Sequence, residues 1–180
     1  MSRMRVVGWV LLVSALGCGY RFTPRGAGLP EGVRSVCAPV FRNDTAEPGL
    51  ELLFTRDFRQ ELLRAGVLGG AGACEASVEG VVVAVGSGPT SIAEPNFQGG
   101  TQTTPPQLAS YHATATVLLR LIREGRVVSE ATVTGSEDFL PGTANLSGEV
   151  LQVEANRQSA LHRLSETLMR EGYDRLASGW

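Results

Sequence analysis

The hydrophobic positions along the chain recur with two periods, one typical of strands and one typical of helices. Residues 34–41 and 76–85 are short runs with apolar side chains on both faces, as in the central strands of a sheet. Between them, leucine and phenylalanine recur every three or four residues from Leu50 to Leu62, which predicts an amphipathic helix that ends at the glycines of 66–72. A strand–helix–strand unit of this kind predicts a right-handed crossover between parallel strands.

The second half of the chain predicts a hairpin followed by a long helix. Residues 111–123 alternate apolar and polar side chains, and 127–135 return after a polar turn. From 149 to 176, apolar residues at helical spacing predict a second helix. The sequence therefore predicts an α+β fold, with two helices on one face of a four-stranded mixed sheet and the element order β-α-β-β-β-α.

Two registers are open to the predicted hairpin. A two-residue loop at 124–125 would place Val117 opposite a threonine. A shift by one residue, with a loop of three or five residues, places Val117 opposite Val133 and Arg120 opposite Glu130. The second register keeps one face apolar and pairs opposite charges on the other, so we expect it.

Residues 86–110 are rich in glycine, proline, serine, threonine and glutamine, and Glu94 is their only charged residue. This composition predicts a long loop, which in a compact domain is either functional or mobile. Its neutrality argues against a phosphate-binding loop. A second loop is expected at 137–148.

The N-terminus has the organisation of a bacterial lipoprotein signal peptide. A basic segment at 1–5 precedes an apolar run at 6–16, which is shorter than the about 20 residues needed to span a bilayer and is typical of an export signal. Gly17 and Cys18 then resemble a lipobox, so we expect cleavage between them and diacylation of the Cys18 thiol. The alternative is an ordinary signal peptide with an incidental cysteine.

Acylation at Cys18 would hold the mature protein stably at a membrane, because more than one acyl chain makes attachment effectively permanent. An aspartate after the cysteine often marks inner-membrane retention, so Gly19 favours the periplasmic face of the outer membrane. The chain then divides into a signal peptide (1–17), a lipidated leader (18–32) and a single α/β domain (33–180).

With Cys18 acylated, Cys37 and Cys74 remain. An even pair in an oxidising compartment favours a disulfide. The alternative is two small buried hydrophobic residues, since cysteines on neighbouring parallel strands would be offset by several residues, too far for a bridge.

The charge balance and the scarce metal-ligating residues exclude several classes of protein. The net charge is −2, and all 16 basic residues are arginine, which argues against a nucleic-acid-binding protein. Two histidines and three cysteines do not form the cluster that a structural zinc site needs. No nucleophile elbow or phosphate-binding loop is present, and His112 and His162 are far apart in sequence. We therefore expect neither enzymatic activity nor a metal or cofactor.

Several segments resemble the LPS-assembly lipoprotein family, LptE. The resemblance starts directly after the lipobox, covers nearly the whole mature chain, and is most specific in its first third. The segments that carry it are Cys18-Gly19-Tyr20-Arg21-Phe22, Pro39-Val40-Phe41-Arg42-Asn43-Asp44-Thr45 and Glu47-Pro48-Gly49-Leu50-Glu51, with weaker similarity at 111–117 and 154–161.

This resemblance implies a non-enzymatic outer-membrane lipoprotein that plugs the lumen of the LptD β-barrel, helps it assemble and takes part in delivering lipopolysaccharide to the cell surface. Lipopolysaccharide carries phosphates, which arginine binds well. Arg120, Arg123 and Arg126 come together at one end of the predicted hairpin, with Arg42 as a candidate neighbour, so these four are candidate ligand-binding residues. A solvated hairpin tip is the alternative interpretation.

The spacing Pro39-x-Phe41-x-Asn43-x-Thr45 is also similar to other periplasmic α/β lipoproteins, including curli-secretion-like and penicillin-binding-protein-activator-like proteins. Such a protein would bind a secretion channel or a cell-wall synthase. The continuation at 47–51 and the Cys-Gly-Tyr start favour the first family.

Overall fold

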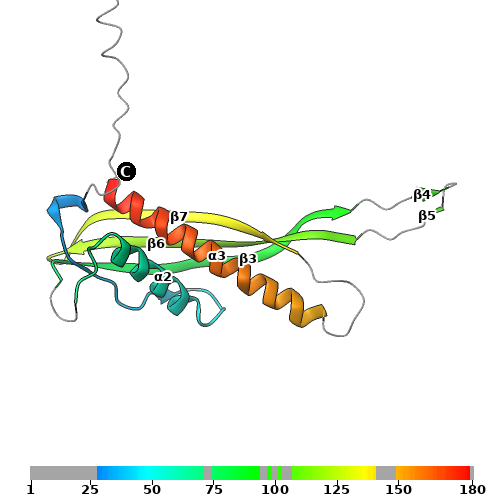
Figure 1. The fold of residues 1–180 in the computed structure, drawn as a ribbon, viewed down its shortest axis with the longest axis horizontal. Coiled ribbons are helices and arrows are strands. Elements are labelled where there is room, and N and C mark those ends of the chain that lie inside the picture. Colours follow the sequence, from blue (N-terminus) through cyan, green and yellow to red (C-terminus); the bar gives the residue numbers. More distant parts are fainter. Residues whose placement is uncertain are drawn as a thin grey trace, which may run out of the picture.

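The computed structural model describes residues 28–70, 74–93, 97–98, 101–102, 107–140 and 149–178. The two long helices and the strands of the main sheet follow the predicted order, with two short strands in place of the first, and the α+β class is confirmed (Figure 1). The elements are η1 (Pro30–Gly32), β1 (Val36–Cys37), β2 (Arg42–Asn43), α2 (Leu50–Arg64), β3 (Ala76–Ala93), β4 (Phe97–Gln98), β5 (Thr101–Gln102), β6 (Gln107–Arg123), β7 (Arg126–Phe139) and α3 (Glu149–Ser178).

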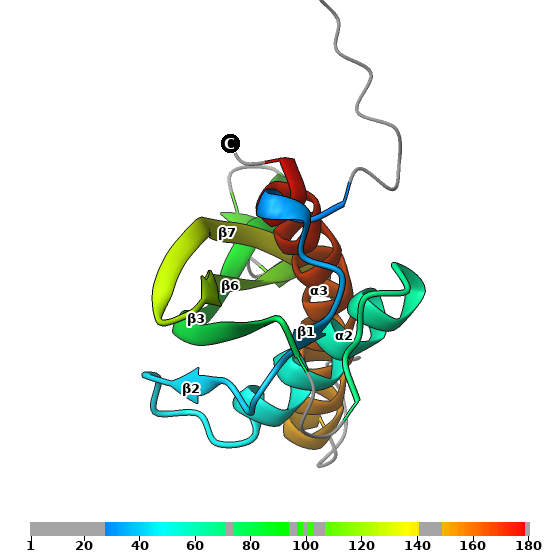
Figure 2. The same ribbon diagram turned by 90° about the vertical axis from the view of Figure 1, so that its left-hand side faces the viewer.

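The main sheet is mixed, as predicted. Strands β3, β6 and β7 follow one another antiparallel, and β1 and β2 both pair in parallel with the outer side of β3. Helix α3 packs across β6 and β7, and α2 packs against α3 and β3, so both helices lie on one side of the sheet (Figure 2). Among the described residues no helix covers the opposite side, which we call the open face.

The first predicted strand, at 34–41, is wrong in its extent, because only two short pairings form there. Between β1 and β2 the backbone bonds to α2 instead: the Arg59 guanidinium donates two hydrogen bonds to the Ala38 carbonyl at 2.8 and 2.6 Å. The Phe41 N–H donates to the Thr55 hydroxyl at 2.9 Å, and Pro39 has no N–H to give a neighbouring strand. Residues 42–43, just beyond the predicted strand, form β2.

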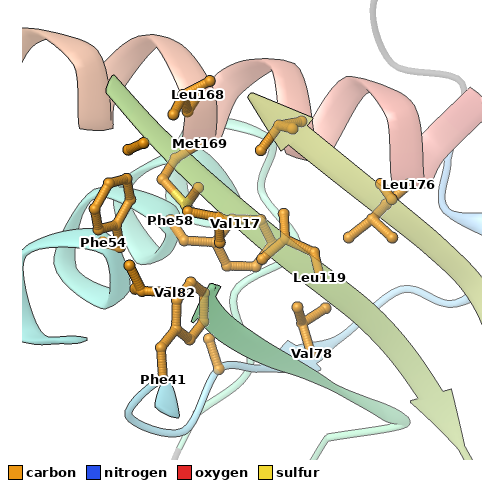
Figure 3. Close-up of a cluster of buried hydrophobic side chains, with 14 of the residues drawn as sticks. Phe41, Phe54, Phe58, Val78, Val82, Val117, Leu119, Leu168, Met169 and Leu176 are labelled. Carbon is orange, nitrogen blue, oxygen red and sulfur yellow. The ribbon is translucent and has the colours of Figure 1, made fainter. Parts of the chain in front are cut away.

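A single apolar core lies between the sheet and the helices, as the predicted periodicities require (Figure 3). The Phe41 ring packs against Phe58, with ring centroids 5.7 Å apart, and lies directly over Gly80, where any side chain would overlap it. The fully buried residues include Phe54, Phe58 and Leu62 of α2, Val78 and Val82 of β3, Val117 and Leu119 of β6, and Leu168, Met169 and Leu176 of α3.

One polar contact crosses this core. Ser165 of α3 is fully buried and its hydroxyl donates to the Asp57 carboxylate of α2, which is also buried. Arg56 forms an ion pair with the other Asp57 oxygen at 2.7 Å. The buried carboxylate is thus fully bonded, and it fixes the position of α2 along α3.

The β6–β7 hairpin has the predicted register but not the predicted loop. Val117 lies opposite Val133 and Arg120 opposite Glu130, as expected. The loop is nevertheless only two residues long, with positive φ at both Glu124 and Gly125, and an irregularity between Leu121 and Ile122 supplies the shift of one residue. The bulge therefore shifts the register by one residue, which keeps the inner face of the hairpin apolar although the turn has only two residues.

The long loop predicted at 86–110 is also wrong. Strand β3 continues to Ala93 and β6 begins at Gln107, so the two strands pair along an arm that extends past the helices (Figure 1). Strand β7 likewise continues to Phe139, into the segment expected to be a loop. The arm extends beyond the core, so its strands are not required to alternate apolar and polar residues. The sequence pattern by which strands are recognised is therefore missing here.

Cys37 and Cys74 form a disulfide with a Cα–Cα distance of 5.6 Å. Cys37 lies opposite Ser77, three residues after Cys74, so the expected offset is present. The bridge forms in spite of it because Cys74 lies before β3 and is not held in the register of β1 and β3. There the N–H groups of Glu75 and Ala76 both donate to the Ser35 carbonyl, which turns this segment across the end of β1. The bridge ties β1 to the start of β3.

Candidate interaction surface

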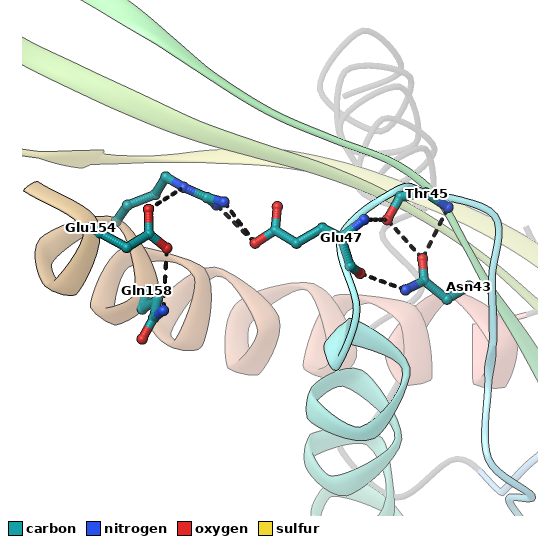
Figure 4. Close-up of polar contacts among 6 residues, drawn as sticks. Asn43, Thr45, Glu47, Glu154 and Gln158 are labelled. Atoms are coloured by element: carbon teal, nitrogen blue, oxygen red, sulfur yellow. Dashed lines mark hydrogen bonds and ion pairs between the residues drawn. The ribbon is translucent and has the colours of Figure 1, made fainter. Parts of the chain in front are cut away.

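The segment 43–51, the most specific part of the sequence pattern, forms the loop between β2 and α2. The Asn43 side-chain oxygen accepts hydrogen bonds from the Thr45 N–H at 3.0 Å and the Thr45 hydroxyl at 2.7 Å, and its amide nitrogen donates to the Glu47 carbonyl at 2.7 Å (Figure 4). This is an Asx turn closed on both sides. It takes the chain off the sheet edge and towards α2.

The same asparagine also fixes the first turn of α2. Its amide donates to the Glu51 carboxylate at 2.9 Å, and the Gly49 N–H donates to the same carboxylate. Gly49 has φ of 92°, a left-handed conformation that glycine adopts freely. Hydrogen bonds from the backbone N–H of Glu51 itself and from Asn43 lower the pKa of the Glu51 carboxyl. The spacing of Asn43, Gly49 and Glu51 therefore has a structural role in starting the helix.

Arg157 connects this loop to helix α3. Its guanidinium donates to the Glu47 carboxylate at 3.0 and 2.7 Å, and to Glu154 at 3.2 Å (Figure 4). The Gln158 amide also donates to Glu154, at 3.2 Å. Glu47 and Arg157 are 110 residues apart in sequence, so no local pattern could have identified the pair.

Four charged residues of alternating sign cross the open face. Arg42 on β2 lies diagonally from Glu79 on β3, Glu79 lies opposite Arg120 on β6, and Arg120 lies opposite Glu130 on β7. Arg120 and Glu130 form an ion pair at 2.6 Å. Arg42 also bonds to Asp44 at 2.8 Å, and this hydrogen bond raises the pKa of Arg42 and lowers that of Asp44.

The hairpin tip holds the other two candidate arginines. Arg123 donates to the Glu31 carbonyl at 2.8 Å, and Arg126 forms an ion pair with the Glu31 carboxylate at 3.2 Å. The structure thus brings Arg123 and Arg126 together around η1, and places Arg42 and Arg120 in the row on the open face. Each of the four arginines faces a carboxylate, so they do not form a group of unpaired cations.

Towards the arm, the open face is polar and carries one carboxylate, Asp138, which lies opposite His112 and accepts a hydrogen bond from the Thr90 hydroxyl at 3.5 Å. Thr116 and Thr134 share a hydrogen bond at 3.0 Å across β6 and β7. His112 bonds to the Thr90 hydroxyl at 3.1 Å, and His162, far away on α3, bonds to Arg56 at 3.3 Å. In the part of the chain that the structure describes, no three metal-ligating side chains come together.

The predicted lipidation site, Cys18, and the cleavage position at Gly17 lie outside the described residues. No helix in the described ranges combines the length and the apolar composition needed to cross a bilayer.

The family model described as "LptE: Lipopolysaccharide-assembly" matches residues 33–176. No curated protein matches the chain.

Among solved structures, the chain is similar to the hypothetical protein CT253 from Chlamydia trachomatis, with 12% identity, coverage of 81% of this chain and 96% of that chain, and a TM-score of 0.51. It is also similar to the PelC dodecamer from Paraburkholderia phytofirmans (14% identity, 84% and 89% coverage, TM-score 0.48) and to the rare lipoprotein B from Shewanella oneidensis (11% identity, 78% and 92% coverage, TM-score 0.41). The likeness to CT253 supports the fold alone, and the other two carry no argument.

Proposed function

Because the chain belongs to the LptE lipopolysaccharide-assembly family, we propose that it is a lipid-anchored protein of the outer membrane that plugs the LptD β-barrel and helps it assemble. The observation that carries this proposal is the extent of the family match, which spans both helices and all strands of the main sheet. The family is one of non-enzymatic assembly lipoproteins, so we assign no catalytic role to the polar side chains described above.

The shape of the molecule supports a plug. The strands run along its long axis, with the helices packed beside them, so the described part is narrow across the strands (Figure 1). The lumen of an outer-membrane barrel is polar. The open face offers threonines and paired charges to such a wall, with Val81 and Leu118 partly exposed among them, while the fully buried apolar side chains lie between the sheet and the helices.

The proposed anchor would lie at one end of this rod. Element η1, the β6–β7 turn and the end of α3 lie together at the end opposite the arm (Figure 1), and Arg126 ties η1 to the turn through Glu31. From Cys18 to the first described residue, Gly28, a fully extended chain reaches at most about 35 Å. An acylated Cys18 would therefore hold this end near the bilayer and leave the β3–β6 arm pointing away from its anchor.

The open face is also the proposed contact for lipopolysaccharide. The side chains of Arg42 and Arg120 are 70% and 44% exposed, and their carboxylate partners are exposed as well. Exposed ion pairs contribute only about 0–1 kcal/mol each, so a phosphate that offers stronger bidentate bonds can replace the carboxylate at low cost. Arg123 and Arg126 also hold η1, so binding there would compete with a structural contact.

Depletion of the chain tests the proposal. Surface lipopolysaccharide is expected to fall on depletion and to return when the full-length chain is restored. If lipopolysaccharide at the surface stays unchanged while cell-wall synthesis or fibre secretion fails, the protein serves a synthase or a secretion channel instead, and the proposed function is wrong.

A further inference from the structure

The outer edge of β3 is paired along only its first half. Strands β1 and β2 lie beside it up to Val82, and the last hydrogen bond on that side runs from the Asp44 N–H to the Val82 carbonyl at 3.0 Å. There the Asx turn at Asn43 takes the chain away into α2. Beyond Val82, no strand of the described ranges pairs with this side of β3.

The free edge is regular over the length of an ordinary strand. Register shifts occur between Val82 and Ala84 and between Pro89 and Ser91, and from Ala84 to Pro89 each residue has a consecutive partner on β6. Strands of about five or six residues are typical of globular proteins. The stretch is therefore long enough to accept a neighbouring strand, with Pro89 at its far end.

This edge carries no charged side chain between Val83 and Thr90. The other edge of the sheet, β7, is shielded in the usual ways. It bears the charged residues Arg126, Glu130, Glu137 and Asp138, and the Arg175 side chain covers part of its backbone by donating to the Thr132 carbonyl at 2.7 Å. This difference between the two edges indicates that the β3 edge is covered when the protein is bound to its partner.

A groove runs beside the start of this edge. It has a volume of about 580 Å³, and its walls are the loop at 45–48 on one side and residues 83–85 of β3 on the other, with Arg157 at its end. Val83 is 46% exposed in it. An added strand that pairs with Ala84 would lie in this groove. It would occupy the position next to β3 beyond the end of β2.

We propose that the outer edge of β3, from Ala84 to Pro89, is a docking site at which an extended segment of the barrel partner adds a strand to the sheet. The proposal rests on the proposed function, because it takes the barrel as the partner. A row of backbone N–H and C=O groups with neutral side chains is matched by another extended backbone, not by an ion or a helix. A closed barrel wall has no free edge, so the segment must come from outside the wall strands.

Hydrogen exchange on the assembled complex tests this pairing directly. The tagged full-length chain is produced with the barrel, and amide exchange at 84–88 is measured in the complex and in the chain alone. The amides that point away from β6 are expected to exchange at least about tenfold more slowly in the complex. Unchanged exchange in an intact complex overturns the docking site and leaves the proposed function standing.

Protection that appears in the chain alone as its concentration rises would mean that a second copy occupies the edge, which also overturns the proposal. If the chain recovers no barrel at all, the proposed function itself is wrong.

Paired lysine variants give a second readout. Val83→Lys places a charge beside the free edge and is expected to lower recovery of the barrel at least about fivefold. Val127→Lys is the matched control, since Val127 is 49% exposed on the opposite edge strand, and it should change recovery less than about twofold. Val83→Thr, which keeps the shape, should bind normally. Equal losses for the two lysine variants overturn the docking site.

Discussion

The Arg157 guanidinium on helix α3 bonds to the Glu47 carboxylate at 3.0 and 2.7 Å, and so joins the C-terminal helix to the loop before α2. Both side chains are largely sheltered, with 19% and 28% of their surface exposed. The contact holds the loop in which Asn43 starts the helix, so the strand-to-helix connection depends on a residue far away in sequence.

Replacing Arg157 with alanine is expected to destabilise the protein by about 1–2 kcal/mol, because its hydrogen bonds to Glu47 and Glu154 are lost and the Glu47 carboxylate is left half-buried without its arginine. Urea unfolding measures the change. Arg163→Ala is the control, since Arg163 pairs with Glu137 at an exposed site, and it should cost less than about 1 kcal/mol. Equal costs for the two variants would contradict this account of the loop.

Replacing Asn43 with alanine is expected to raise the pKa of the Glu51 carboxyl towards its ordinary value, since one of the hydrogen bonds that lower it is removed. A carboxyl with a lowered folded-state pKa adds stability above its unfolded pKa, and this stability is lost as the pH falls through the folded pKa. The difference in stability between wild type and variant should therefore shrink under acid conditions.

An NMR titration of the Glu51 carboxyl, together with urea unfolding at neutral and acid pH, measures both effects. A Glu51 pKa that does not move in Asn43→Ala, or a stability difference that grows as the pH falls, would show that Asn43 acts elsewhere.

Reduction of the Cys37–Cys74 disulfide is expected to destabilise the fold by about 3–4 kcal/mol in the chain-entropy account, because the bridge closes a loop of 37 residues that contains α2. The midpoint of thermal unfolding should fall in dithiothreitol. The double variant Cys37→Ser, Cys74→Ser should unfold at the lower midpoint with or without the reductant. A wild-type midpoint of thermal unfolding that is unchanged by dithiothreitol would contradict a stabilising role for the bridge.

The sequence was sufficient to predict the helices and strands that bury one face, because burial of one face leaves a regular pattern of apolar residues. The hairpin register followed from Val117, Val133 and the charges of Arg120 and Glu130, because a shift by one residue would have exposed the apolar face. The β3–β6 arm could not be predicted, since residues 86–90 are glycine, serine, proline and threonine and show no alternation of apolar and polar side chains.

The candidate site was predictable in part. The sequence identified the four candidate arginines and the pairing of Arg120 with Glu130. It did not identify Glu79, which reaches Arg120 through the pairing of β3 with β6, or Glu31, which reaches Arg126 from η1, far away in sequence. The role of Asn43 was also hidden, since an Asx turn that closes on Glu47 and Glu51 depends on the path of the folded backbone. The pairing of Cys37 with Cys74 required the turn before β3 to be known.

Replacing both Arg42 and Arg120 with glutamine is expected to weaken binding of purified lipopolysaccharide by at least about tenfold, because two phosphate-binding groups are lost from the open face. Stability should fall by less than about 1 kcal/mol, since both ion pairs are exposed. Arg163→Gln, on α3, is the control and should bind as wild type does. Normal binding by the double variant would exclude the open face as the glycolipid contact.

The central claim is that this chain sits inside a barrel, and co-purification from the envelope tests it most directly. A tagged full-length chain, solubilised in mild detergent, should bring down a large heat-modifiable β-barrel in equal amount. Recovery of the chain as a free lipoprotein, or with a cell-wall synthase or a secretion channel in place of the barrel, would contradict the account.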